Sequence, residues 1–122
     1  MTVKEYLART YRSNEVIGVS RKELERLREL QGINGISRAA SRRISELERK
    51  IDKEINDYIE LLDLIRQQIE SVTNADERLL LRKRYLLFET WENIAADMDY
   101  SVQWIRKLHK RALLSFARKN GI

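Results

Sequence analysis

A stripe of apolar residues, spaced three or four positions apart from Ile44 to Val72, constrains this fold most strongly. Its members are Ile44, Leu47, Ile51, Ile55, Tyr58, Leu62, Ile65, Ile69 and Val72. This heptad pattern predicts one helix of about 30 residues, about 45 Å long, with a narrow apolar face. That face must pack against another helix. The partner is either the segment Ser20–Gln31, folded back as a hairpin, or the same helix of a second subunit in a homodimer through residues 44–72.

The composition favours helix and excludes several classes of protein. The chain has no proline, no cysteine and only four glycines, so few residues interrupt a helix. Without cysteine, a disulfide scaffold, a zinc finger and thiol catalysis are all excluded. The longest apolar run, residues 85–88, is far shorter than the roughly 20 residues of a membrane span. The charged N-terminus also lacks a signal-peptide core, so we expect no membrane association and a cytoplasmic location.

The first 43 residues carry weaker signals. Residues 2–17 are predicted to form a short helix. Ser20 precedes Glu23 by three positions, which is the spacing of a capping box, so a second helix is expected to start at Ser20. Gly32 and Gly35 are expected to end it.

The last third of the chain is patterned as three capped helices over about 75–88, 91–98 and 102–120. Capping residues stand at the expected boundaries: Asn74, Thr90, Ser101 and Gly121. A short helix, a tight turn and a longer helix form a helix-turn-helix. We therefore predict an all-α protein with an N-terminal helical segment (1–43), a long coiled-coil-like helix (44–73) and a C-terminal three-helix helix-turn-helix domain (74–122).

The predicted final helix separates apolar from basic residues. At 100° per residue its apolar side holds Val102, Ile105, Leu108, Ala112, Leu113 and Phe116. The opposite side and its flanks hold Gln103, Trp104, Arg106, Lys107, Lys110, Arg111, Leu114 and Arg118. Residues 101–120 contain six Lys or Arg and no acid, in a chain of net charge +5. Such a face can neutralise phosphates while its first side chains enter a major groove, which predicts double-stranded DNA as a partner.

Residues 84–113 resemble a known family. The segments that carry the resemblance are Arg84-Tyr85-Leu86, Thr90-Trp91-Glu92-Asn93-Ile94-Ala95, Met98-Asp99-Tyr100-Ser101 and Leu108-His109-Lys110-Arg111-Ala112-Leu113. They are similar to the sigma-factor region 4-like helix-turn-helix, and more narrowly to small phage proteins related to the ArpU/RinA-type late transcriptional regulators. The resemblance implies a phage or prophage regulator in the bacterial cytoplasm that binds promoter DNA, with RNA polymerase as a further candidate partner.

The resemblance also implies which residues meet DNA. Base reading would belong to Val102, Gln103, Arg106 and Lys107, and Ser101 would contact phosphate. Of the residues on the basic face, Lys107, Lys110, Arg111 and Arg118 would supply mainly phosphate attraction, while Gln103 and Arg106 would supply base discrimination. Asp99 stands where such domains often carry glycine, and Val102 replaces a residue that is often polar. The target DNA sequence therefore does not carry over.

Two other functions fit the same pattern. A small terminase-like subunit for genome packaging also joins a helix-turn-helix to a helical oligomerisation segment, and a ring of eight or more chains would favour it. A helical protein–protein adaptor would use both helical regions for protein contacts, and would show no salt-dependent retention of DNA.

The sequence shows no pattern typical of catalysis. The only histidine, His109, lies near the apolar side of its helix, where a hydrogen-bonded, partly buried imidazole is expected. One histidine without cysteine cannot assemble a transition-metal site. Nor does the sequence contain a nucleophile–base pair or a glycine-rich phosphate loop. We expect no enzyme, no cofactor and no metal, and we expect Trp91 to lie in the core. Trp104 lies off the apolar stripe, so packing against the preceding helix, stacking on a DNA sugar and a partner contact are all open, with a core or semi-core position favoured.

Overall fold

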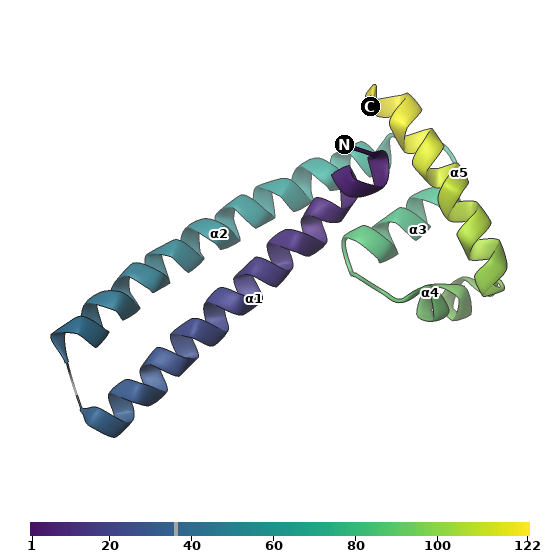
Figure 1. The fold of residues 1–122 in the computed structure, drawn as a ribbon. Coiled ribbons are helices and arrows are strands. Elements are labelled where there is room, and N and C mark those ends of the chain that lie inside the picture. The colour runs from purple at the N-terminus through teal and green to yellow at the C-terminus, as the bar shows by residue number, and fades with distance from the viewer. Residues whose placement is uncertain (36) are drawn as a thin grey trace. The chain divides into compact units, whose positions relative to one another are not determined.

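The computed structural model describes residues 1–35 and 37–122, and every regular element in these ranges is a helix. The helices are α1 (Val3–Asn34), α2 (Arg38–Glu70), α3 (Ala75–Tyr85), α4 (Trp91–Met98) and α5 (Val102–Asn120) (Figure 1). The predicted all-α class is therefore confirmed. In the described part of the chain, none of the helices is both long and apolar enough to cross a lipid bilayer.

The chain forms two compact units whose boundaries fall inside α1 and α2. Residues Met1–Tyr11 and Leu61–Ile122 form the first, here called the globular unit. Residues Arg12–Glu60 form the second, the hairpin unit. This division differs from the three consecutive segments expected from the sequence, because both ends of the chain contribute to the globular unit.

The predicted break in the N-terminal region is wrong. α1 continues without interruption past Ser20, which is buried at 3% exposure. Its hydroxyl donates a hydrogen bond to Glu54 Oε1 of α2 over 2.9 Å, instead of capping a helix. The predicted end is confirmed, because Gly35 follows the last residue of α1 with φ +77°.

The hairpin unit contains one small core between α1 and α2, which lie side by side (Figure 1). Its members are Leu24, Ile44, Leu47 and Ile51, with Leu27 and Ile55 packed beside them. The first half of the apolar stripe is thus buried against the same chain, as the hairpin alternative predicts. The helix begins at Arg38, earlier than the predicted Ile44. A homodimer through residues 44–72 stays a prediction.

The larger core of the globular unit joins segments that are far apart in the sequence. Its buried members are Leu7, Ile65, Ile69, Val72, Leu81, Tyr85, Ala112 and Phe116. Polar contacts reinforce it: the Tyr6 hydroxyl donates to Gln68 Oε1 over 2.7 Å, and the buried Thr10 hydroxyl donates to the carbonyl of Tyr85 over 2.6 Å. The first turns of α1 and the last turns of α2 therefore complete the core on which α3 and α5 rest.

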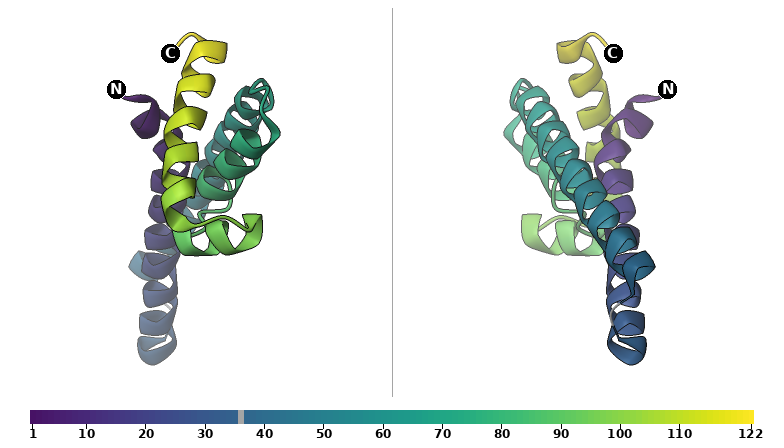
Figure 2. Two further views of the ribbon diagram at one scale, coloured as in Figure 1. Left: turned by 90° about the vertical axis from the view of Figure 1, so that its right-hand side faces the viewer. Right: turned by 90° about the vertical axis from the view of Figure 1, so that its left-hand side faces the viewer.

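A second core positions α4 against α3 and α5. It consists of Leu80, Ile94, Ala95, Ile105 and Leu108, with Trp91, Met98 and Val102 at its edge. Figures 1 and 2 show α4 lying across the end at which α5 begins. This packing holds the apolar side of α5 and leaves its other side outward.

Candidate nucleic-acid interface

Side-chain caps fix where the last three helices begin. Each predicted N-cap oxygen accepts a hydrogen bond from the backbone N–H three residues later: Asn74 from Glu77, Thr90 from Asn93 and Ser101 from Trp104, over 2.9, 3.1 and 3.1 Å. Gly121 ends α5 in the left-handed region with φ +67°, also as predicted. Only the end of the first of these helices differs, because α3 stops at Tyr85 instead of Phe88.

The turn between α4 and α5 depends on one aspartate. Asp99 adopts the left-handed conformation with φ 59° and ψ 42°, which aspartate tolerates better than most residues other than glycine. The next residue, Tyr100, donates its backbone N–H to the Ala95 carbonyl over 2.9 Å. Its hydroxyl donates to Asp76 Oδ2 over 2.7 Å, which ties the turn to the start of α3.

The outward side of α5 presents most of the predicted DNA-contacting residues. Exposed side chains are those of Ser101, Gln103, Arg106, Lys107, Lys110, Arg111 and Arg118. Val102 differs, because it is half-buried beside the second core. Within residues 1–35 and 37–122, no Lys or Arg of α5 lies within ion-pair distance of a carboxylate. Their positive charge is therefore available to an external anion.

One of these cations, Arg111, contacts an aromatic ring. The guanidinium carbon of Arg111 lies 5.4 Å from the ring centre of Trp104, and that ring lies 6.1 Å from the ring of Tyr100. Trp104 is 37% exposed, so it does not lie inside the core. A cation–π contact restricts the guanidinium without neutralising it. Arg111 is thus oriented at the outward side of α5.

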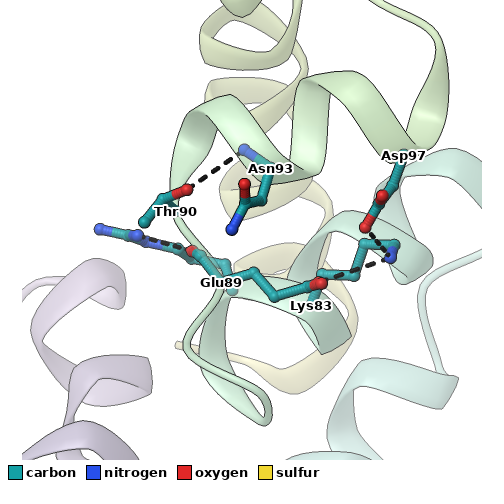
Figure 3. Close-up of polar contacts among 6 residues, drawn as sticks. Lys83, Glu89, Thr90, Asn93 and Asp97 are labelled. Atoms are coloured by element: carbon teal, nitrogen blue, oxygen red, sulfur yellow. Dashed lines mark hydrogen bonds and ion pairs between the residues drawn. The ribbon is translucent and has the colours of Figure 1, made fainter.

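A polar network joins α3 to α4 and to the loop between them (Figure 3). Lys83 Nζ lies 3.1 Å from Asp97 Oδ2 and 3.4 Å from Glu89 Oε2. Arg84 adds a hydrogen bond from Nη1 to the carbonyl of Glu89 over 2.8 Å. In the described ranges Glu89 Oε2 is buried without a hydrogen bond, so Lys83 is its electrostatic compensation. The sequence analysis missed this network, since no local pattern pairs these charges.

A buried carboxylate forms a further link that the sequence analysis missed. Glu77 is buried, and its Oε1 accepts a hydrogen bond from the hydroxyl of Ser115 on α5. The bond joins the start of α3 to the second half of α5, so it helps to set the direction of α5 relative to α3.

The only histidine occupies the structural position expected for it. His109 is 7% exposed, and its Nε2 and the Tyr85 hydroxyl share a hydrogen bond of 2.7 Å. Burial, with smaller effects from Lys4 and Arg84, lowers the pKa of His109 to about 4, while burial raises the pKa of Tyr85 to about 12. Both side chains are therefore neutral near pH 7, and they support the core.

Neither the comparisons with known proteins nor a search for metal ligands assigns a function to this chain. Comparison with protein-family models, curated proteins and solved structures finds no significant match to this chain. In the described part of the chain, the acidic residues and His109 form no group that could hold a metal ion. The outward side of α5 is therefore the main basis for a functional proposal.

Proposed function

We propose that the chain binds double-stranded DNA through the outward side of α5 and acts as a transcriptional regulator of the phage or prophage type. The observation that carries the proposal is the division of α5 into a packed apolar side and an exposed basic side. Among the described residues, no carboxylate lies within ion-pair distance of that basic side. An α-helix fits the major groove of B-DNA, and cations along it can replace the counter-ions of several phosphates.

The two ends of α5 would have different roles. Gln103 and Arg106 lie near its start, where side chains of a recognition helix meet base edges. Lys107, Lys110 and Arg111 follow on the same side and would contact phosphates. Arg118 is 15 positions after Gln103, or about 22 Å farther along a helix, so it would meet the backbone outside the groove.

The regulatory part of the proposal is supported by the resemblance of residues 84–113 to sigma-factor region 4. RNA polymerase is accordingly proposed as a second partner. A homodimer through residues 44–72 would double the number of basic helices on one DNA molecule. Because most of the apolar stripe of this segment is buried within its own chain, the dimer would use exposed residues such as Ile59 and Leu64. Mass measurement in solution tests that dimer, and a ring of eight or more chains would favour genome packaging instead.

A binding titration tests the DNA contact. A duplex selected from a random pool and an unselected duplex are each titrated with the full chain. We expect Arg106→Ala to lose about 1–3 kcal/mol of discrimination between them, if the side chain makes a bidentate contact to guanine. Lys110→Ala should weaken both duplexes alike. Lys50→Ala removes an exposed charge from the hairpin unit and serves as the matched control.

Salt dependence gives an independent measurement. If one chain neutralises about five phosphates, log K should fall against log salt with a slope of about −4 to −5, and Lys110→Ala should reduce its magnitude by about 1. A folded protein whose DNA affinity is unchanged by either α5 substitution would contradict the proposal. Absent or salt-insensitive DNA binding would favour the adaptor function.

A further inference from the structure

A second surface feature of the globular unit is a cavity between the first turns of α1 and the loop that follows α3. Its volume is about 350 Å³, and it is lined by Lys4, Ala8, Tyr11, Arg84, Tyr85 and Phe88. Pockets for small ligands commonly measure about 300–1,000 Å³ and combine apolar walls with a few polar groups. The cavity has this composition and contains no acidic side chain in its lining.

Two cations, Lys4 and Arg84, line the cavity. Arg84 is half-buried, and its guanidinium carbon lies 4.2 Å from the ring centre of Trp91. Among the residues that the structure describes, neither Arg84 nor Lys4 lies within ion-pair distance of a carboxylate. Burial is the main cause of the lowered pKa of His109, and the charges of Lys4 and Arg84 lower it further. Both cations therefore lie close enough to His109 to affect it. A partly desolvated cation without a counter-ion favours binding of an anion.

An aromatic pair supplies the apolar wall. The rings of Tyr11 and Phe88 lie 5.5 Å apart in an edge-to-face arrangement. Phe88 has φ 58°, which is strained for a bulky residue and is held by the surrounding structure. Such strain often marks a ligand site, because a loop must present a side chain in one place. A further ring could join this pair in an offset or edge-on contact.

We propose that this cavity binds a small organic anion, namely a carboxylate or phosphate group attached to an aromatic ring. The anionic group would lie between Lys4 and Arg84, and the ring would pack against Tyr11 and Phe88. The cavity residues are different from the outward residues of α5. The proposal therefore does not rest on DNA binding, and it can succeed or fail independently.

An NMR titration of the full chain tests the site. Phenyl phosphate and phenylacetate represent the two anionic groups on the same ring. We expect saturable, millimolar binding of at least one of them, with amide shifts at Lys4, Ala8, Tyr11 and Phe88. Inorganic phosphate, which lacks the ring, and phenethylamine, which carries the opposite charge, should each bind at least fivefold more weakly. Relative affinity of the first two probes then distinguishes a phosphate site from a carboxylate site.

Substitutions localise the binding. Lys4→Gln removes an exposed charge and should weaken the preferred probe about threefold to fivefold, as for a solvent-exposed ion pair. Arg84→Gln should weaken it at least tenfold, whereas Arg84→Lys should retain part of the affinity. Because Arg84 also contacts Glu89 and Trp91, Lys4→Gln keeps the test valid if the Arg84 variants do not fold. Lys50→Gln in the hairpin unit is the matched control and should leave binding unchanged.

Several results would overturn the proposal. One is that phenethylamine binds as tightly as the aromatic anions, and another is that Lys4→Gln leaves the affinity unchanged. The others are amide shifts confined to α5, or no saturable binding of either aromatic anion. Equal affinity for inorganic phosphate would also overturn it, because the aromatic wall would then contribute nothing.

Discussion

The globular unit and the hairpin unit are both built from helices, yet different interactions hold them together. The globular unit has two cores, four side-chain N-caps at Thr2, Asn74, Thr90 and Ser101, and buried polar links between its helices. The hairpin unit has one small core, one side-chain N-cap at Ser37, and two part-buried links between its helices, Ser20–Glu54 and Gln31–Ser41. Its ion pairs, such as Lys53–Asp57, are exposed. Exposed pairs contribute about 0–1 kcal/mol. The comparison indicates that stability is concentrated where apolar faces meet from several directions, as they do in the globular unit.

The largest expected loss of stability comes from a cavity in the core of the globular unit. Phe116 is fully buried, so Phe116→Ala should lower the free energy of unfolding of this unit by about 3–5 kcal/mol. DNA binding should fall with it. Urea unfolding followed by circular dichroism measures the loss. Leu114→Ala, at an exposed position of the same helix, is the control and should change stability by less than about 0.5 kcal/mol.

A matching cavity in the hairpin unit should have a more local effect. Leu47 is also fully buried, and Leu47→Ala should cost about 2–4 kcal/mol. We expect faster native-state hydrogen exchange within residues 12–60, with protection in α3 and α5 unchanged. Equal loss of protection in both units would show that they unfold together, which contradicts the comparison.

Lowering the pH should destabilise the globular unit more than the hairpin unit, because the only histidine lies in the globular unit. The folded pKa of His109, about 4, lies below its ordinary value of 6.5, so the unfolded state binds more protons between these values. Stability from this group is complete above pH 6.5 and falls as the pH drops towards 4. The loss between pH 7 and pH 5 should be up to about 2 kcal/mol.

NMR titration of the His109 ring measures this pKa directly, and urea unfolding at several pH values measures the stability change. In His109→Gln the dependence on pH between 7 and 5 should become smaller. Protection within residues 12–60 should not vary over that range. A folded pKa near 6.5 would remove the predicted effect.

The smallest expected losses of stability come from substitutions of two serines, one in each unit. Ser101 caps α5, and Ser101→Ala should cost about 1 kcal/mol, because the N–H of Trp104 loses its partner. Ser20 lies inside α1, so Ser20→Ala should cost less: alanine favours helix and offsets part of the lost bond to Glu54. Thermal unfolding of the two variants compares them. A larger loss at Ser20 would mean that its bond stabilises the hairpin unit more than its small core suggests.

Local signals predicted the last three helices well. Caps such as Thr90 and Ser101 act within three residues, so a short stretch of sequence contains all the information that they require. The same reasoning failed at Ser20, because its capping-box spacing also fits the interior of a helix. Its neighbours Ile17 and Leu24 are buried in the hairpin unit, and α1 continues through the supposed break.

Contacts between distant segments could not be predicted. Nothing near Leu7 indicates that it lies in one core with Phe116, because that contact depends on the path of the whole chain. The outward side of α5 followed from helical angles, but Trp104 lies at the edge between the two sides. It contacts Tyr100 and Arg111, and helical angles alone do not predict these contacts.

The shared core of Leu7, Ile69 and Phe116 also has a topological consequence. The hairpin unit is an insertion between the two segments that form the globular unit. Residues 74–122 alone would lack part of the core that supports α5. A minimal engineered version would retain residues 1–11 and 61–122 and replace the intervening residues with a short linker. Conversely, the insertion could grow or shrink by whole helical turns while the body that carries α5 keeps its architecture.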